Sequence, residues 1–133
     1  MNSAAPPNPA PPAPLADTVA PTFVLFSFRG RVPRKAYWLY GVLGPVLMSV
    51  ILQLLLGIVG MAERCADVAI SLLLIWPCTA VAVKRWHDRD KSGWWVLINL
   101  IPLAGLVWSL IENGLLRGSA GANRFGADLT REF

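Results

Sequence analysis

The chain has 133 residues, of which 55% are hydrophobic and only 15% are charged, and its net charge is +4. Soluble domains carry about 25% charged residues, so this composition excludes an ordinary soluble protein and indicates an all-α integral membrane protein. The basic excess does not require nucleic acid as a partner, because membrane orientation explains clusters of Lys and Arg.

The first 22 residues are rich in proline and alanine. Seven of the eleven prolines lie here, and Asp17 is the only charged residue of this stretch. Proline removes backbone donors and favours extended conformations, which predicts a disordered tail over 1–22. The tail lacks the basic and apolar regions of a secretory signal. Residues 23–133 are therefore expected to form a single membrane domain.

A short segment after the tail combines aromatic and basic residues. Its sequence is FVLFSFRGRVPRKAYW, in which three phenylalanines are followed by Arg29, Arg31, Arg34 and Lys35. Such a segment can lie in the membrane interface, with its rings among acyl chains and its cations among anionic headgroups. This pattern predicts a short interfacial amphipathic segment before the first span. The alternative is that the arginines only fix the orientation of the chain.

Three apolar runs predict three transmembrane helices, near 37–60, 66–83 and 94–111. The first run contains no charged residue and is long enough to span a bilayer with some tilt. The second run is shorter and ends at Lys84 and Arg85, whose long stems can reach back to the headgroups.

The third run decides the topology. It has no charge from Val96 to Ile111, a length of about 24 Å as a helix, and tryptophans lie near both of its ends. Tryptophan favours the two membrane interfaces, which supports a third span. A rival topology makes this segment re-entrant, with Asn99, Pro102 and Gly105 breaking the helix.

The positions of Lys and Arg predict the orientation. With three spans, the first segment and the loop KRWHDRDKS share one side and carry eight basic residues, against four on the other. This favours a cytoplasmic N-terminus and places the glycine-rich C-terminal tail, 112–133, outside. The re-entrant topology would instead put eleven of the twelve basic residues on one side.

Four separated motifs resemble the domain-of-unknown-function family numbered 805. They are FRGRVPRKAYW, KRWHDRDKSGWW, IPLAG and GANRFGAD, and the resemblance covers Phe26 to Asp128. It implies a multi-pass protein of the bacterial cytoplasmic (inner) membrane whose activity is not established. The chain departs from the family pattern at Lys84, Trp86 and Leu129, where arginine, leucine and proline are usual. The motif residues, to which the resemblance assigns no role, are Gly30, His87, Asp88, Gly93, Trp94, Asn123, Arg124, Phe125 and Gly126.

The motifs contain no complete catalytic or metal site. His87 adjoins Asp88 and could act as a general base, but adjacent residues on a helix do not face each other. No nucleophile has a positioned partner. One histidine and two cysteines show no metal-ligand spacing. The sequence therefore predicts no catalytic residue, no metal and no cofactor.

The leading hypothesis is a non-enzymatic membrane protein. It contacts anionic lipid, or a membrane partner such as a second copy of the chain, through a basic rim on the inner side. The basic rim consists of Arg29, Arg31, Arg34, Lys35, Lys84, Arg85, Arg89 and Lys91. The alternative is a membrane enzyme or transport component that uses His87 and Asp88.

Overall fold

The fold is helical in the part of the chain that can be described. The computed structural model describes residues 20–61 and 63–131, and no strand occurs within these ranges. Most of the predicted tail, 1–22, lies outside the described residues. Its last two residues already belong to the first helix, α2 (Pro21–Phe26), where a proline suits the first helical position.

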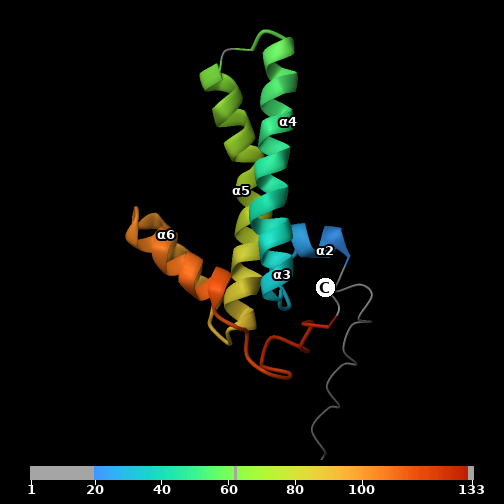
Figure 1. Cartoon of the computed structure of the whole chain (residues 1–133), viewed down its shortest axis with the longest axis vertical. Coiled ribbons are helices and arrows are strands. Elements are labelled where there is room, and N and C mark those ends of the chain that lie inside the picture. Colours follow the sequence, from blue (N-terminus) through green and yellow to red (C-terminus); the bar gives the residue numbers. More distant parts are fainter. Residues whose placement is uncertain (1–19, 62, 132–133) are drawn as a thin grey trace, which may run out of the picture.

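Two long helices form an antiparallel pair (Figure 1). The first is continuous over Arg34–Ile58 and consists of α3 (Arg34–Ala36), the π-helical η1 (Tyr37–Leu43) and α4 (Gly44–Ile58). The second, α5 (Glu63–Asp88), returns beside it. Both helices are long and apolar enough to cross a membrane, by length and composition.

A glycine ends the long helix Arg34–Ile58 and starts the turn to α5. Gly60 has a φ of +79°, a left-handed conformation that glycine adopts at little cost. Its amide donates to the carbonyl oxygen of Gly57 (3.0 Å), and the amide of Met61 donates to that of Leu56 (3.0 Å). These two bonds form a Schellman motif, which satisfies the last carbonyls of the helix while the chain reverses.

Helices occupy the first two predicted spans, but their ends differ from the prediction. The prediction of 37–60 corresponds to the helix Arg34–Ile58, and the prediction of 66–83 to α5. The second helix continues past Val83 through the sequence KRWHD. The charged motif that the sequence places in a loop therefore begins on a rigid helix.

The third predicted span is not one helix, and the prediction of a continuous helix over 94–111 is wrong. The segment begins as the 3₁₀ helix η2 (Gly93–Leu100). A second helix follows, made of α6 (Ala104–Ser109) and the π-helical η3 (Leu110–Leu115). We call residues 93–115 the lateral hairpin, because α6 extends to one side of the helix pair in Figure 1.

The chain of the lateral hairpin folds back at Pro102. Proline has no amide donor with which to continue a helix, and Leu103 turns the chain with a φ of +59°. The two halves then pack backbone against backbone. A Cβ atom on Gly105 would lie 1.9 Å from the carbonyl oxygen of Ile98, so only glycine fits at this position.

The packed core lies at one end of the helix pair, which we call the base. Here α2 packs against α5, and a small cluster is buried that consists of Val24, Val32, Ala36 and Val81. Beyond the base, the apolar side chains of α4 and α5 are mostly exposed. The described part of the chain is thus a compact base from which two apolar helices extend.

Candidate functional site

Four ionisable side chains are buried together at the base, and we call them the basal cluster. They are Arg31, Lys84, Arg85 and Asp88, each at most 3% exposed. Three of them lie on the last turns of α5, where Arg85 and Asp88 are one turn apart and face the same side. Arg31 comes from the segment between α2 and α3. Burying a charged side chain is costly unless it has hydrogen-bond or ion-pair partners, so the stability of the cluster depends on the partners of each group.

Arg31 joins the end of α5 to the C-terminal segment. Its Nε and Nη2 donate to Oδ1 of Asp88, at 3.0 and 2.8 Å. The remaining donors reach the carbonyl oxygens of Ser119 (2.7 Å) and Gly121 (2.6 Å). The planar guanidinium suits this fork of acceptors, which an ammonium group could not match.

Arg85 joins the same carboxylate to the end of the lateral hairpin. Its Nη1 donates to Oδ2 of Asp88, so each carboxylate oxygen accepts from a different arginine. Its Nε and Nη2 donate to the carbonyl oxygens of Asn113 (2.7 Å) and Leu116. The last carbonyls of a helix lack partners within the helix and carry partial negative charge, which explains a buried cation at the end of η3.

Lys84 fastens α2 to the base. Its Nζ donates to the carbonyl oxygens of Phe23 (2.6 Å) and Val24 (2.5 Å), and it lies 5.0 Å from the centre of the Phe23 ring. The basal cluster thus holds three cations and one carboxylate. Backbone carbonyl oxygens supply the remaining acceptors, so the cluster joins α5 to α2, to the segment between α2 and α3, to the lateral hairpin and to the C-terminal segment.

The structure divides the predicted basic rim into three groups. Arg31, Lys84 and Arg85 are buried and bonded internally, which is incompatible with a role as surface contacts. Arg89 and Lys91 are partly exposed and pair with a carboxylate. The exposed members are Arg29, Arg34 and Lys35.

Arg89 and Lys91 both form ion pairs with Glu112 of η3. Arg89 Nη2 lies 3.0 Å from its Oε2, and Lys91 Nζ lies 3.0 Å from its Oε1. Burial alone would raise the pKa of Glu112, but the contacts with Lys91 and Arg89 lower the pKa below its ordinary value. The ionised carboxylate therefore ties the loop after α5 to the lateral hairpin.

The stabilising effect of Glu112 is expected to depend on pH. Because its pKa is lower in the folded than in the unfolded state, its contribution is present above the ordinary value of about 4.3 and is lost as the pH falls through the lowered pKa. At neutral pH, Glu112→Gln should lower the free energy of unfolding by about 1 kcal/mol. This difference should shrink as the pH is lowered from about 5 to about 3, measured by thermal unfolding in detergent. A difference that does not change with pH would contradict the pairing.

The family-motif residues meet at a second place on the base. The ring of His87 stacks on that of Phe125, with centroids 3.9 Å apart and an angle of 4° between the planes. Nδ1 of His87 donates to the carbonyl oxygen of Gly30 (3.1 Å), since that oxygen can only accept. Asn123 Nδ2 donates to the carbonyl oxygen of His87 (2.9 Å). Gly93 also lies against the ring, since a Cβ on Gly93 would be 3.2 Å from Nε2 of His87. The histidine ring is held from several sides.

A tight turn in the sequence NRFG presents Phe125 to His87. Asn123 and Gly126 exchange backbone hydrogen bonds of 3.0 and 3.1 Å, and Gly126 has a φ of +139° that suits glycine. Oδ1 of Asn123 accepts from the amide of Phe125 (2.9 Å). Arg124 pairs with the exposed Asp90 at 3.2 Å. Of the motif residues, Trp94 is 77% exposed at the start of η2.

These contacts correct the predicted topology. Three spans would put the His87 loop and the NRFG turn on opposite faces of a membrane, whereas Asn123 contacts His87 directly. The prediction that the tail 112–133 lies on the opposite side is therefore wrong. The broken third segment is the reason, because a chain that folds back at Pro102 returns to the base of the helix pair, where Asn123 meets His87.

The geometry does not form a catalytic pair from His87 and Asp88. Nδ1 of the histidine is bonded to Gly30, and both oxygens of the aspartate accept from arginines. No group of three or more potential metal ligands occurs among residues 20–61 and 63–131.

The sequence did not predict two residues of the basal cluster's surroundings, Ser119 and Asn113, whose carbonyl oxygens accept from the buried arginines. No local signal marks a backbone acceptor.

Sequence comparison identifies the family. Residues 25–127 match the family described as "Protein of unknown function (DUF805)". The chain belongs to the DUF805 family. This confirms the resemblance that the four motifs indicated. The matched DUF805 range contains the basal cluster, the lateral hairpin and the NRFG turn, whereas Phe23 and Val24, whose carbonyl oxygens accept from Lys84, lie just before it.

Three relatives from Escherichia coli (strain K12) are similar over most of their length. Inner membrane protein YhaH is 36% identical over 105 residues, covering 76% of this chain and 85% of YhaH. Inner membrane protein YhaI is 32% identical over 103 residues, covering 76% and 84%. The uncharacterized protein YiiR is 30% identical over 132 residues, covering 78% and 86%. No solved structure matches this DUF805 chain.

Proposed function

We propose that this protein is a non-enzymatic, multi-pass protein of the bacterial inner membrane that contacts anionic lipid through the exposed part of its basic rim. The exposed part consists of Arg29, Arg34 and Lys35. The names of two relatives, both inner membrane proteins, support the location. The observation that carries the function is the exposure of these three cations at the base, beside apolar helices, while the other cations of the rim are buried or partly buried.

In the proposed topology two helices span the membrane, Arg34–Ile58 and α5, and both ends of the described chain lie on the cytoplasmic side. The NRFG turn contacts the end of α5, so the C-terminal segment shares the base with α2. Eleven of the twelve Lys and Arg residues then belong to the base side, and Arg64, at the start of α5, is the exception. This strong asymmetry supports a cytoplasmic base.

The lateral hairpin is proposed to lie in the inner interface. Its 3₁₀ part is about 16 Å long and its second helix about 18 Å, and each is shorter than the roughly 30 Å hydrocarbon core. It exposes large apolar side chains, among them Trp94 (77%), Leu100 (78%) and Leu103 (77%). Such exposed tryptophan and leucine suit the boundary between headgroups and acyl chains. The helix α2 is proposed as the interfacial segment at the entry of the first span.

A compartment-sensitive reporter tests the topology. A reporter fused after Phe133 should give a cytoplasmic signal, and one inserted after Met61, in the turn between the long helices, should give a periplasmic signal. A fusion after Ser92 serves as the cytoplasmic control. A periplasmic signal from the Phe133 fusion would overturn the two-span topology.

Lipid binding by the purified protein tests the function. Each basic residue near an anionic surface contributes about 1 kcal/mol, so the triple variant R29Q/R34Q/K35Q should bind phosphatidylglycerol at least about tenfold more weakly. Native mass spectrometry from detergent measures the bound lipid. Arg64→Gln, at the other end of α5, is the control and should bind as the parent does. Unchanged binding by the triple variant would refute the proposed function.

A further inference from the structure

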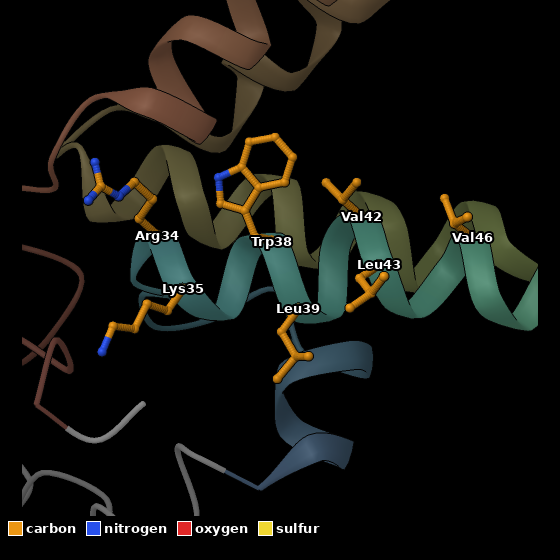
Figure 2. Close-up of a pocket in the computed structure, with 7 residues that line it drawn as sticks. All are labelled: Arg34, Lys35, Trp38, Leu39, Val42, Leu43 and Val46. Carbon is orange, nitrogen blue, oxygen red and sulfur yellow. The ribbon is translucent and has the colours of Figure 1, made fainter.

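An open groove runs along the outer face of the first long helix, starting at the base. Its volume is about 690 Å³. Figure 2 shows its lining, which comes entirely from the helix Arg34–Ile58. The lining residues are Arg34, Lys35, Trp38, Leu39, Val42, Leu43 and Val46.

The lining forms two rows of side chains, each with a spacing of four residues. One row is Arg34, Trp38, Val42 and Val46, and the other is Lys35, Leu39 and Leu43; Figure 2 shows them along two edges of the helix. Rows at this spacing form ridges on a helix, with a groove between them. Each row begins with a cation at the base and continues with apolar side chains. The groove is therefore basic at one end and apolar along the rest.

Two of the lining side chains are fixed by the end of η3. Nε1 of Trp38 donates to the carbonyl oxygen of Gly114 (3.0 Å), and Nη1 of Arg34 donates to that of Leu115 (2.8 Å). The indole lies so close to Gly114 that a Cβ there would be 3.0 Å from Cζ2 of the ring. A groove whose walls are held by a second segment is a preorganised site, which reduces the entropic cost of binding.

We propose that this groove binds one anionic diacyl phospholipid of the inner leaflet. Its phosphate contacts Arg34 and Lys35, and one acyl chain lies between the two rows as far as Val46. The distance from Lys35 to Val46 is about 16 Å along a helix, which matches half of the roughly 30 Å hydrocarbon core, the depth of one leaflet. The charge at the basic end complements a phosphate, and the apolar remainder excludes a purely hydrophilic anion. This site rests on the proposed function and deepens it from a general surface contact to one defined lipid.

The test fills the apolar part of the groove without changing its charge. Val46→Trp places a large ring in the groove, and Ile51→Trp places the same ring on the same helix outside it. The two positions are matched in exposure, at 53% and 52%, so neither change should affect folding. Phosphatidylglycerol, phosphatidylcholine with the same chains, and glycerol 3-phosphate are titrated against each protein by native mass spectrometry, with mass also reporting oligomeric state.

The unchanged protein should retain one phosphatidylglycerol and bind phosphatidylcholine and glycerol 3-phosphate more weakly. Val46→Trp should weaken phosphatidylglycerol binding at least tenfold, whereas Ile51→Trp should leave it unchanged. Equal binding of phosphatidylglycerol by Val46→Trp and Ile51→Trp would overturn the groove as the lipid site. The triple variant R29Q/R34Q/K35Q then shows separately whether the basic rim still contacts anionic lipid. Equally tight binding of glycerol 3-phosphate, or a dimer that Val46→Trp disrupts, would also overturn the proposal, in favour of a free anion or a second copy of the chain.

Discussion

Replacing Asp88 by asparagine is expected to lower the free energy of unfolding by about 3–5 kcal/mol, because removal of one partner leaves buried charge uncompensated. Asp88 is the only carboxylate of the basal cluster, and each of its oxygens accepts from a buried arginine. Asparagine is neutral, and its amide nitrogen would face one of the two guanidinium groups as a second donor. Arg31 and Arg85 would then lie buried without an anion, and the segments that they join should separate from α5.

Asp90→Asn is the matched control for this prediction. It makes the same chemical change two residues along, in a pair with Arg124 whose side chains are 51% and 60% exposed. An exposed pair contributes little, so the expected loss is at most about 1 kcal/mol. Both variants are compared by chemical unfolding in detergent. Equal stability of the two variants would show that the basal cluster does not hold the base together.

Replacing Gly105 by alanine is expected to open the lateral hairpin. The added Cβ would lie 1.9 Å from the carbonyl oxygen of Ile98 and 3.0 Å from Cα of Asn99. Both atoms belong to the backbone, so no flexible side chain can move aside. Overpacking of this kind costs about 1–3 kcal/mol and more where the backbone must shift. The two halves of the hairpin should therefore move apart.

Hydrogen exchange of the segment 93–109 measures this opening, because separated helices lose the protection that packing gives to their amides. Gly57→Ala is the control. It is a helical glycine on α4 with no atom within 4 Å of its added Cβ, so this change should be neutral or mildly stabilising. If the amides of 93–109 are as well protected from exchange in Gly105→Ala as in the unchanged protein, the close packing of α6 on η2 is refuted.

The sequence by itself determined the two long helices, the helical class and the family. Hydropathy acts along the chain, and runs without charge from Tyr37 and from Val68 mark helices wherever they pack. The turn between them is also local, because Gly60 supplies the left-handed residue that ends the first helix. The four motifs likewise carry the DUF805 family in residue identity and order alone.

Only the tertiary structure decided what the basic residues and the third apolar segment do. Arg31 and Arg34 lie in the same basic segment, and the sequence does not distinguish them. Arg31 is nevertheless buried, because Asp88, 57 residues away, and Gly121, 90 residues away, supply its acceptors. The third segment has the hydropathy of a span, and Pro102 permits a break without requiring one. Its fold was decided by backbone packing at Gly105 and by buried arginine at the end of η3. Such contacts join residues far apart in the chain, so their energy leaves no local pattern from which a sequence could predict them.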